Sequence, residues 1–309
     1  MTLTRRQTLL SGAALPFAAA SAASVRPAAA QGMSMTPPNA IKRSFMLGDF
    51  EVSTLLAGTR TVESPQEIFG MNVPPEEFAE VSAANFIPTD KAQFFFTPTV
   101  VDTGSGIVLF DAGLNAEGIT AALAAAGYAP DDVSTVVITH MHGDHIGGLT
   151  AEDGTPTFAN AAYVTGQAEF DHWAAQNDET FEAKVRPLAD RFTFIGDEAE
   201  VAPGITGLAA FGHTPGHMVY RVSSGGRDVL LMADLANHYV WSVAYPDWEV
   251  RFDADKAAAA QSRRRILGMA AAERMPVIGY HMPFPAMGFI DTRGDGFHYV
   301  PTSYQMMLG

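Results

Sequence analysis

Six consecutive residues constrain this chain more than any other feature. The segment His140-Met-His142-Gly-Asp144-His145 places three imidazoles and a carboxylate directly after a β-branched run, residues 133–139. Such a run is typical of a buried strand, and the chain must turn where it ends, so several of these side chains can point inward together. Imidazole and carboxylate suit zinc or a similar first-row ion, and four such groups exceed what one catalytic ion usually takes. The motif therefore predicts a site for two ions rather than a surface loop rich in histidine by chance.

Further histidine and aspartate residues follow other apolar segments. His217 closes the segment Gly212-His-Thr-Pro-Gly-His217, Asp234 ends an apolar strand-like run, and His281 follows Val277-Ile-Gly-Tyr. These three residues complete a candidate set of metal ligands.

This order of residues resembles the metallo-β-lactamase superfamily, in which an H-x-H-x-D-H motif is followed by His, Asp and His. The resemblance extends over residues 45–305 and implies an α/β fold, a four-layer αββα sandwich. It also implies the ligands of each ion: His140, His142 and His217 for one, Asp144, His145 and His281 for the other, with Asp234 as the bridge.

The cofactors implied by the resemblance are two divalent metal ions, zinc. A hydroxide between them would attack the substrate, so the implied catalytic residues are Asp144, which orients the hydroxide or carries a proton, and the bridging Asp234.

The C-terminal segments narrow the resemblance to one branch of the superfamily. Gly279-Tyr-His281-Met-Pro-Phe-Pro285 and Phe297-His-Tyr-Val-Pro301 are similar to the branch of methyl parathion hydrolase and exported lactonases. This implies a small-molecule substrate, a lactone or an aryl ester, with organophosphate triesters as possible further substrates and a homodimer as a possible assembly. The alternatives are a β-lactamase-type hydrolase and a non-catalytic periplasmic metal-binding protein. Asn237 departs from some acyl-homoserine lactonases, which have Tyr at this place.

The remaining histidines are expected to have lesser roles. His213 is interpreted as a structural residue rather than a ligand, and His172 and His298 as ordinary residues. His238 either faces the substrate or lies in a solvated loop. Asp111 is expected to support a ligand. One or two aromatic residues should line a pocket beside the ions, and the candidates are Phe94, Phe95, Phe96, Phe170, Trp173 and Phe284.

The pattern of apolar residues predicts alternating strands and helices. Strands are expected at 45–56, 94–102, 107–111, 133–139, 162–165, 191–195, 229–233 and 276–279, and helices at 115–126, 166–176 and 255–273. The segment up to Asp90 should contain at most short helices and could serve as a lid or a dimer arm. The apolar runs that end in Asp111 and Asp234 suggest two equivalent halves.

The N-terminus predicts export. Arg5-Arg6 before a short apolar run, with Ala28-Ala29-Ala30 as a cleavage site, indicates a twin-arginine signal peptide over residues 1–30. A Sec signal and cleavage elsewhere in 18–30 are the alternatives. A flexible lead-in is expected over residues 31–44, followed by the hydrolase domain over 45–309, in the periplasm or secreted. The formal charge of -15 argues against nucleic acid and anionic membranes as partners, and the absence of cysteine excludes disulfides.

Overall fold

The computed structural model describes residues 42–307, which belong to one unit of the chain, Ala40–Gly309. The predicted signal peptide, its cleavage site and most of the lead-in lie outside the described residues. Strand β1 begins at Lys42, so residues 42–44, which were predicted as part of the lead-in, belong to the first sheet. In this part of the chain no helix is long and apolar enough to cross a membrane.

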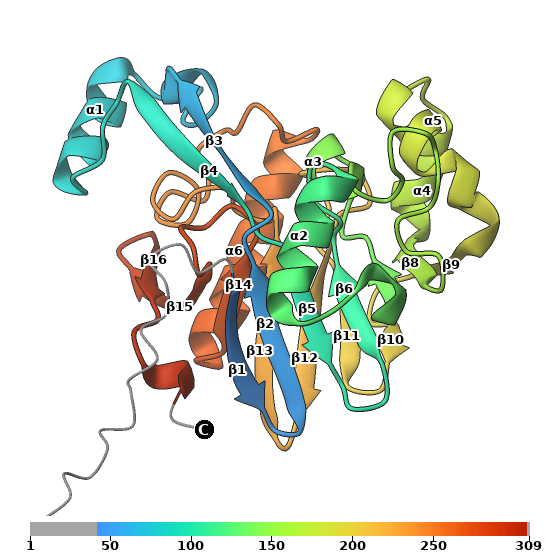
Figure 1. Cartoon of the computed structure of the whole chain (residues 1–309). Coiled ribbons are helices and arrows are strands. Elements are labelled where there is room, and N and C mark those ends of the chain that lie inside the picture. The colour runs from blue at the N-terminus through green and yellow to red at the C-terminus, as the bar shows by residue number, and fades with distance from the viewer. Residues whose placement is uncertain (1–41, 308–309) are drawn as a thin grey trace, which may run out of the picture. The chain divides into compact units, whose positions relative to one another are not determined.

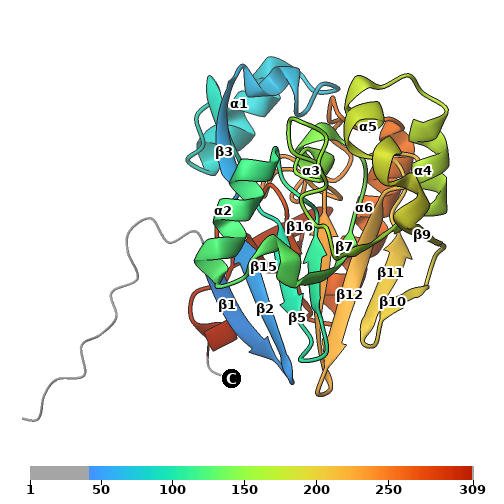
Figure 2. The ribbon, with the colours of Figure 1, turned by 45° about the vertical axis from the view of Figure 1, so that its right-hand side comes forward.

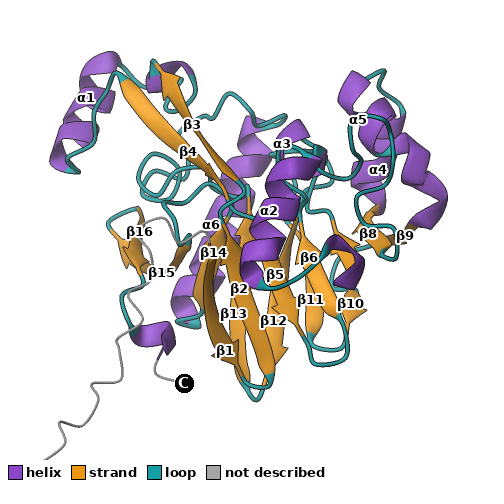
Figure 3. Ribbon diagram, viewed as in Figure 1, coloured by secondary structure: helices purple, strands orange, loops and turns teal. Residues whose placement is uncertain are grey.

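The described residues form two seven-stranded sheets that lie face to face (Figures 1 and 3). The first has the order β1-β2-β5-β6-β7-β8-β9 and the second β10-β11-β12-β13-β14-β15-β16. Strands of the first sheet are β1 Lys42–Leu47, β2 Phe50–Leu55, β5 Thr99–Asp102, β6 Ile107–Phe110, β7 Val133–Val137, β8 Ala162–Gly166 and β9 Phe192–Ile195. Strands of the second are β10 Glu200–Ala202, β11 Ile205–Ala209, β12 Met218–Ser224, β13 Arg227–Ala233, β14 Pro276–Gly279, β15 Met287–Arg293 and β16 Gly296–Pro301.

Helices cover the outer faces of both sheets, whereas α1 and α3 lie at one end of the sandwich (Figure 3). The six helices of the described residues are α1 Pro75–Ala84, α2 Ala116–Ala126, α3 Gly143–Ile146, α4 Gln167–Ala174, α5 Glu179–Lys184 and α6 Lys256–Ala272. The 3-10 turns are η1 Pro65–Glu67, η2 Pro130–Asp132, η3 Arg186–Arg191 and η4 Gln305–Met307. Helix α2 packs on the first sheet through Ile119 and Leu123, and α6 packs on the second through Ile266 and Leu267. A third apolar cluster fills the space between the sheets, with residues such as Val137 from one and Leu231 from the other. The predicted four-layer αββα sandwich is confirmed.

Local sequence explains the element ends that were predicted correctly. The Asn115 side chain accepts a hydrogen bond from the Gly118 N–H at 2.8 Å and so caps α2. Gly127 ends the same helix with a φ of 90°, a conformation that glycine adopts without steric cost. Helix α6, capped by Asp255, closely matches its predicted range.

Two predicted strands are in fact interrupted. Residues 45–56 form β1 and β2, because the chain turns at Gly48, which has a φ of 59°. Residues 94–102 are divided at Thr97-Pro98, since Pro98 has no N–H to donate to a sheet. The first part belongs to β4 Lys91–Phe96, which pairs with β3 Gly58–Glu63 in a separate two-stranded sheet.

The segment before Asp90 is more ordered than predicted. It contributes β3 and the ten-residue helix α1, which lie at one end of the sandwich, the same end as α3 (Figures 1 and 2). Aromatic residues fasten this segment to the loop after β13, with Trp241 packed between Phe69 and Phe78. We describe β3, β4 and α1 together as the cap.

The sheet topology brings distant residues to the end of the sandwich beneath the cap. Strands β6 and β13, the central strands of their sheets, end immediately before Asp111 and Asp234. This agrees with the two equivalent halves inferred from the sequence. Each central strand has a parallel neighbour, β7 and β14, and parallel strands end at the same edge of a sheet. The residues that follow these four strands therefore meet.

Candidate metal centre

The H-x-H-x-D-H segment leads from β7 into the short helix α3. His142 has extended backbone and precedes the first residue of the helix, which directs Asp144 and His145 into the first turn. The turn lies very close to the chain after β6. A Cβ on Gly147 would be 2.1 Å from the carbonyl oxygen of Leu114, so only glycine allows this approach.

A first cluster consists of three imidazoles whose ring nitrogens converge. His140 Nε2 lies 3.0 Å from His142 Nδ1, and His213 Nε2 lies 3.2 Å and 3.1 Å from these two atoms. His213 comes from the loop between β11 and β12, so the first cluster joins the two sheets. These atoms have the separation expected of ligands to one ion.

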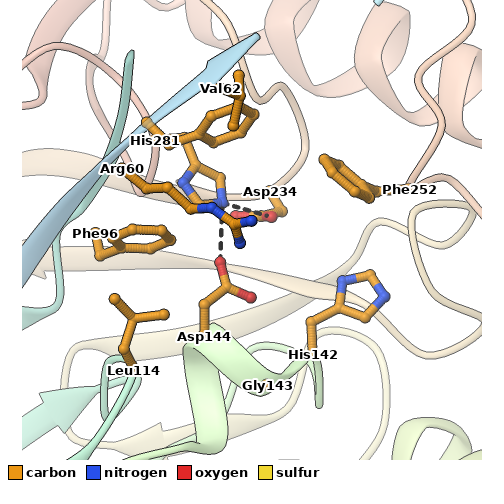
Figure 4. Close-up of a pocket in the computed structure, with 11 residues that line it drawn as sticks. Arg60, Val62, Phe96, Leu114, His142, Gly143, Asp144, Asp234, Phe252 and His281 are labelled. Carbon is orange, nitrogen blue, oxygen red and sulfur yellow. Dashed lines mark hydrogen bonds and ion pairs between the residues drawn. The ribbon is translucent and has the colours of Figure 1, made fainter. Parts of the chain in front are cut away.

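A second cluster consists of Asp144, His145 and His281. Figure 4 shows Asp144 and His281 facing each other, with Asp234 beside them. His281 Nε2 lies 3.3 Å from Asp144 Oδ2, and His145 Nε2 lies 3.8 Å from the same oxygen. Asp234 stands between the clusters: its Oδ2 is 3.1 Å from His281 Nε2 and 3.4 Å from His213 Nε2. The structure thus brings together six of the seven predicted ligands.

The exception is His217, whose predicted role is corrected by the structure. Both ring nitrogens of His217 are engaged with the backbone: Nδ1 donates to the Ala210 carbonyl at 3.2 Å, and Nε2 accepts from the Asp234 N–H at 3.2 Å. Neither nitrogen has a lone pair free for an ion. His213, which was interpreted as structural, takes the position in the first cluster, while His217 orients the backbone that carries Asp234.

The residues present fit a pair of bound cations. His145 Nε2 and Asp234 Oδ1 are buried, and neither has a hydrogen-bond partner in the described part of the chain. A buried polar atom without a partner is energetically unfavourable, and a bound ion would supply the missing partner to both atoms. The two atoms face each other at 3.2 Å, as ligands of the same ion would. Burial also lowers the pKa of His142 to about 3, so this imidazole is neutral and can bind a cation.

The carboxylates change the protonation of the other histidines. Burial alone would lower the pKa of His213, but hydrogen bonds to Asp234 and Asp253 raise it to about 9. For His281 the same burial effect is outweighed by the charges of Asp234 and Asp144, which also raise its pKa to about 9. Burial opposes the charged form of His145 as well, but Asp234 and Asp111 raise its pKa well above the usual value. A cation that binds here must therefore displace protons from His145, His213 and His281.

Two aspartates hold the ligand imidazoles from behind. Asp111 Oδ2 accepts from His145 Nδ1 at 2.8 Å, as its predicted supporting role requires, and Asp111 itself accepts from the N–H and hydroxyl of Thr139. Asp253, which sequence reasoning missed, accepts from His213 Nδ1 at 3.0 Å. A carboxylate in this place fixes the tautomer that leaves Nε2 free for an ion.

Glu169 on α4 connects two of the ligand loops and was also missed. Its carboxylate is fully buried and accepts four hydrogen bonds. Oε1 accepts from the Met141 N–H and the Trp173 indole, and Oε2 from the Thr214 hydroxyl and the Gly216 N–H. Glu169 therefore ties the loop of His140 and His142 to that of His213.

Residues after Asp234 support the centre or the cap. The Asn237 amide donates to Asp234 Oδ2 at 2.9 Å, so Asn237 positions this carboxylate. His238 neither faces a pocket nor lies in solvent: it is buried and stacked on Trp241, with ring centroids 4.0 Å apart. Tyr280 donates its hydroxyl to the Asp144 carbonyl and stacks against His145.

A cavity of about 380 Å³ opens over the second cluster. Its walls come largely from the cap, with Arg60 and Val62 on β3 and Phe94 and Phe96 on β4, and Phe252 stands opposite (Figure 4). Side chains on alternate positions of a strand share a face, which explains why Phe94 and Phe96 line the cavity together.

The other aromatic candidates have different places. Phe95 uses its backbone carbonyl to accept from His281 Nδ1 at 2.8 Å, Phe170 packs against the core under the first sheet, and Phe284 lines a separate cavity. Trp173 contacts the edge of His142, with ring centroids 5.8 Å apart. No local pattern of residues predicted Arg60 or Phe252, which the fold brings to the cavity from distant segments.

A family model described as the metallo-beta-lactamase superfamily matches residues 97–276, more than half of the 309-residue chain. An N-acyl homoserine lactonase of Bacillus sp is 34% identical over 91 residues, 29% of this chain and 33% of that protein. One from Bacillus cereus is 29% identical over 114 residues, 37% of this chain and 42% of that protein. The chain therefore aligns with less than half of the length of these curated relatives.

Solved structures resemble this one in fold. AidC, a dizinc quorum-quenching lactonase in complex with a product, has a TM-score of 0.79 and 23% identity, covering 86% of this chain and 100% of that one. The hydrolase AbOPH of the beta lactamase superfamily also has a TM-score of 0.79, with 22% identity, covering 86% of this chain and 99% of that one. At these identities the similarity establishes the fold.

Proposed function

Because the chain belongs to the metallo-beta-lactamase superfamily, we propose that it is a hydrolase with two divalent metal ions, zinc, that acts on lactones or aryl esters. The observation that carries this proposal is the pair of ligand clusters joined by Asp234 beneath a cavity with apolar walls. His140, His142 and His213 would hold one ion, and Asp144, His145 and His281 the other.

Bound ions would lower the pKa of a water molecule and polarise the carbonyl oxygen of a substrate. The chain's own groups determine how a substrate meets that chemistry. Asp144 has the most accessible carboxylate of the centre, with 24% of its side chain exposed, and it lines the cavity. It is therefore placed to orient the attacking water and to carry a proton to the leaving oxygen. Asp234, which is almost fully buried, is placed to bridge the ions.

The cavity supports an ester with an apolar substituent as the substrate. Phe94, Phe96, Val62 and Phe252 offer apolar contacts for an acyl chain or an aromatic ring. Arg60 can donate hydrogen bonds to a carbonyl oxygen at the same wall. The curated relatives are N-acyl homoserine lactonases, which supports an N-acyl lactone as the first substrate to examine.

The test compares substrates and metal states on one preparation. Metal content is measured by mass spectrometry, and kcat/KM is measured for an N-acyl homoserine lactone, an aryl acetate, a nitrophenyl phosphotriester and a chromogenic cephalosporin. We expect two ions per chain, activity that chelation removes and zinc restores, and the highest kcat/KM for the lactone. A preference for the cephalosporin would favour the β-lactamase-type alternative. No hydrolysis of any substrate after zinc restoration would favour the non-catalytic metal-binding protein.

Three finer features remain predictions. Organophosphate hydrolysis is tested by the phosphotriester in the same panel. Export by the signal peptide at residues 1–30 is tested by fractionation of cells that express the full chain, with the paired Arg5-Arg6 replaced by Lys as the comparison. The homodimer is tested by light scattering of the purified protein.

A further inference from the structure

The two clusters of the metal centre differ in the charges within and behind them. The first cluster contains only imidazoles, whereas the second contains the carboxylate of Asp144. Asp234 contacts both clusters and is shared between them. A dication is attracted in proportion to the negative charge of its ligands, so Asp144 by itself should give the second cluster the higher affinity for its ion.

Arg263 on α6 increases this difference. It is fully buried, and its Nη1 donates to Asp253 Oδ2 at 2.8 Å while its Nε donates to the Pro246 carbonyl at 2.7 Å. The carboxylate behind His213 is thus neutralised by a buried cation. The carboxylate behind His145, that of Asp111, is held by neutral donors of Thr139 and keeps its full charge.

The resulting charges can be counted. Asp144 and Asp111 give the second cluster a charge of -2. Behind the first cluster the charges of Asp253 and Arg263 cancel, and Glu169, which accepts from the Met141 N–H, leaves a charge of -1. The two clusters therefore differ by one charge, apart from the shared Asp234. Nothing in the imidazole ligands themselves compensates for this difference, since both clusters use neutral imidazole to bind an ion.

We propose that the ion pair of Asp253 and Arg263 makes the metal centre unequal, so that the second cluster binds its ion first and the first cluster is the weaker, exchangeable site. This inference rests on the proposed dinuclear function and adds the order in which the ions bind. It assigns to Asp253 and Arg263 the role of positioning residues for His213.

Matched substitutions distinguish the two sites by their effect on imidazole tautomers. In Asp253→Asn, Arg263 continues to donate to the amide oxygen, so the NH₂ group faces His213 Nδ1. His213 then carries its proton on Nε2 and cannot bind an ion there. Asp111→Asn acts in the same way on His145, because Thr139 keeps the amide oxygen. Arg264→Met on the same helix is the control, since its ion pairs with Asp247 and Asp295 are exposed.

The experiment titrates zinc into the metal-free full-length protein against a competing chelator, with circular dichroism to verify folding. Wild type should bind two ions in two steps of different affinity. Asp253→Asn should weaken the second step by about 10- to 100-fold and leave the first, while Asp111→Asn should weaken the first step by a similar factor. Cobalt substitution gives an independent spectroscopic signature of the ligands at each step.

Each outcome decides between the proposals. Equal affinities, the reverse order, or equal effects of Asp253→Asn on both steps would overturn the inference and leave the dinuclear hydrolase standing. Fewer than two bound ions in wild type would overturn both. An effect of Arg264→Met as large as that of Asp253→Asn would also overturn the inference, because an exposed ion pair that contacts no ligand would then matter as much as the one behind His213.

Discussion

Glu169→Gln should destabilise the fold and the metal centre together. The carboxylate accepts four hydrogen bonds in a fully buried position, two on each oxygen. Glutamine has one oxygen, so its NH₂ group must face two donors and two charge-assisted hydrogen bonds are lost. At about 1.5 to 3 kcal/mol each, the free energy of unfolding falls by about 3 to 6 kcal/mol. This corresponds to a decrease in Tm of about 10 °C for a domain of this size.

Calorimetry of the metal-free protein measures this change, and a zinc titration measures its effect on the centre. Zinc should bind more weakly, because Glu169 holds the backbone of Met141, between His140 and His142. Glu182→Gln is the matched control: that carboxylate is exposed and paired only with Arg186 among the described residues, so its loss should leave the stability almost unchanged. A Tm and a zinc affinity for Glu169→Gln equal to those of the control would refute the reasoning.

Three further predictions concern the ligands and the cavity. His213→Ala should reduce the metal content from two ions to one, as mass spectrometry can measure. His217→Ala should keep both ions and lower the unfolding free energy by about 1 to 3 kcal/mol, because the Asp234 N–H loses its acceptor. Equal metal loss in the two variants would contradict the assignment of His213 as the ligand. Zinc binding at about pH 7 should release protons from His213 and His281, whose pKa is about 9 without metal, and from His145, whose pKa is also raised, so affinity should rise towards about pH 9. Calorimetry in two buffers with different ionisation enthalpies measures the release, and identical heats would contradict it. Phe252→Ala should raise KM for a long-chain acyl lactone by about 5- to 10-fold with little change in kcat, because an apolar contact with the acyl chain is lost. Steady-state kinetics with short and long acyl chains measures this effect. A decrease confined to kcat would argue against it.

The fold and most of the ligands were predictable from the sequence because their signals are local. Each of these signals acts within a few residues: the β-branched run before His140, Asn115 at the N-terminus of α2, and Gly127 at its C-terminus. The interruption of residues 94–102 was also indicated locally, by Pro98. The pairing of β4 with β3 outside the main sheets was not indicated locally, because it depends on contacts between distant segments.

The choice between His213 and His217 was not predictable from the pattern of residues. Both lie in one loop, and what decides between them is the partner of each Nδ1 atom. His213 reaches Asp253, 40 residues away, while His217 reaches the Ala210 carbonyl of its own loop. Asp253 and Glu169 were missed for the same reason, because their partners come from elements that only the folded chain brings together.

The wall of the cavity and the metal centre have separate structural origins. Arg60, Val62, Phe94 and Phe96 belong to the two-stranded sheet of the cap, whereas the ligands follow strands of the two larger sheets. Strand β4 connects them, because the Phe95 carbonyl accepts from His281 Nδ1 and the rings of Phe94 and Phe96 pack against His281. Arg60 and Val62 on β3 line the same cavity without such a connection in the described part of the chain. Selection for a new ester, or directed evolution towards one, can therefore proceed through β3 with the least disturbance of the ligands, and a library restricted to this strand is the economical starting point for altering specificity.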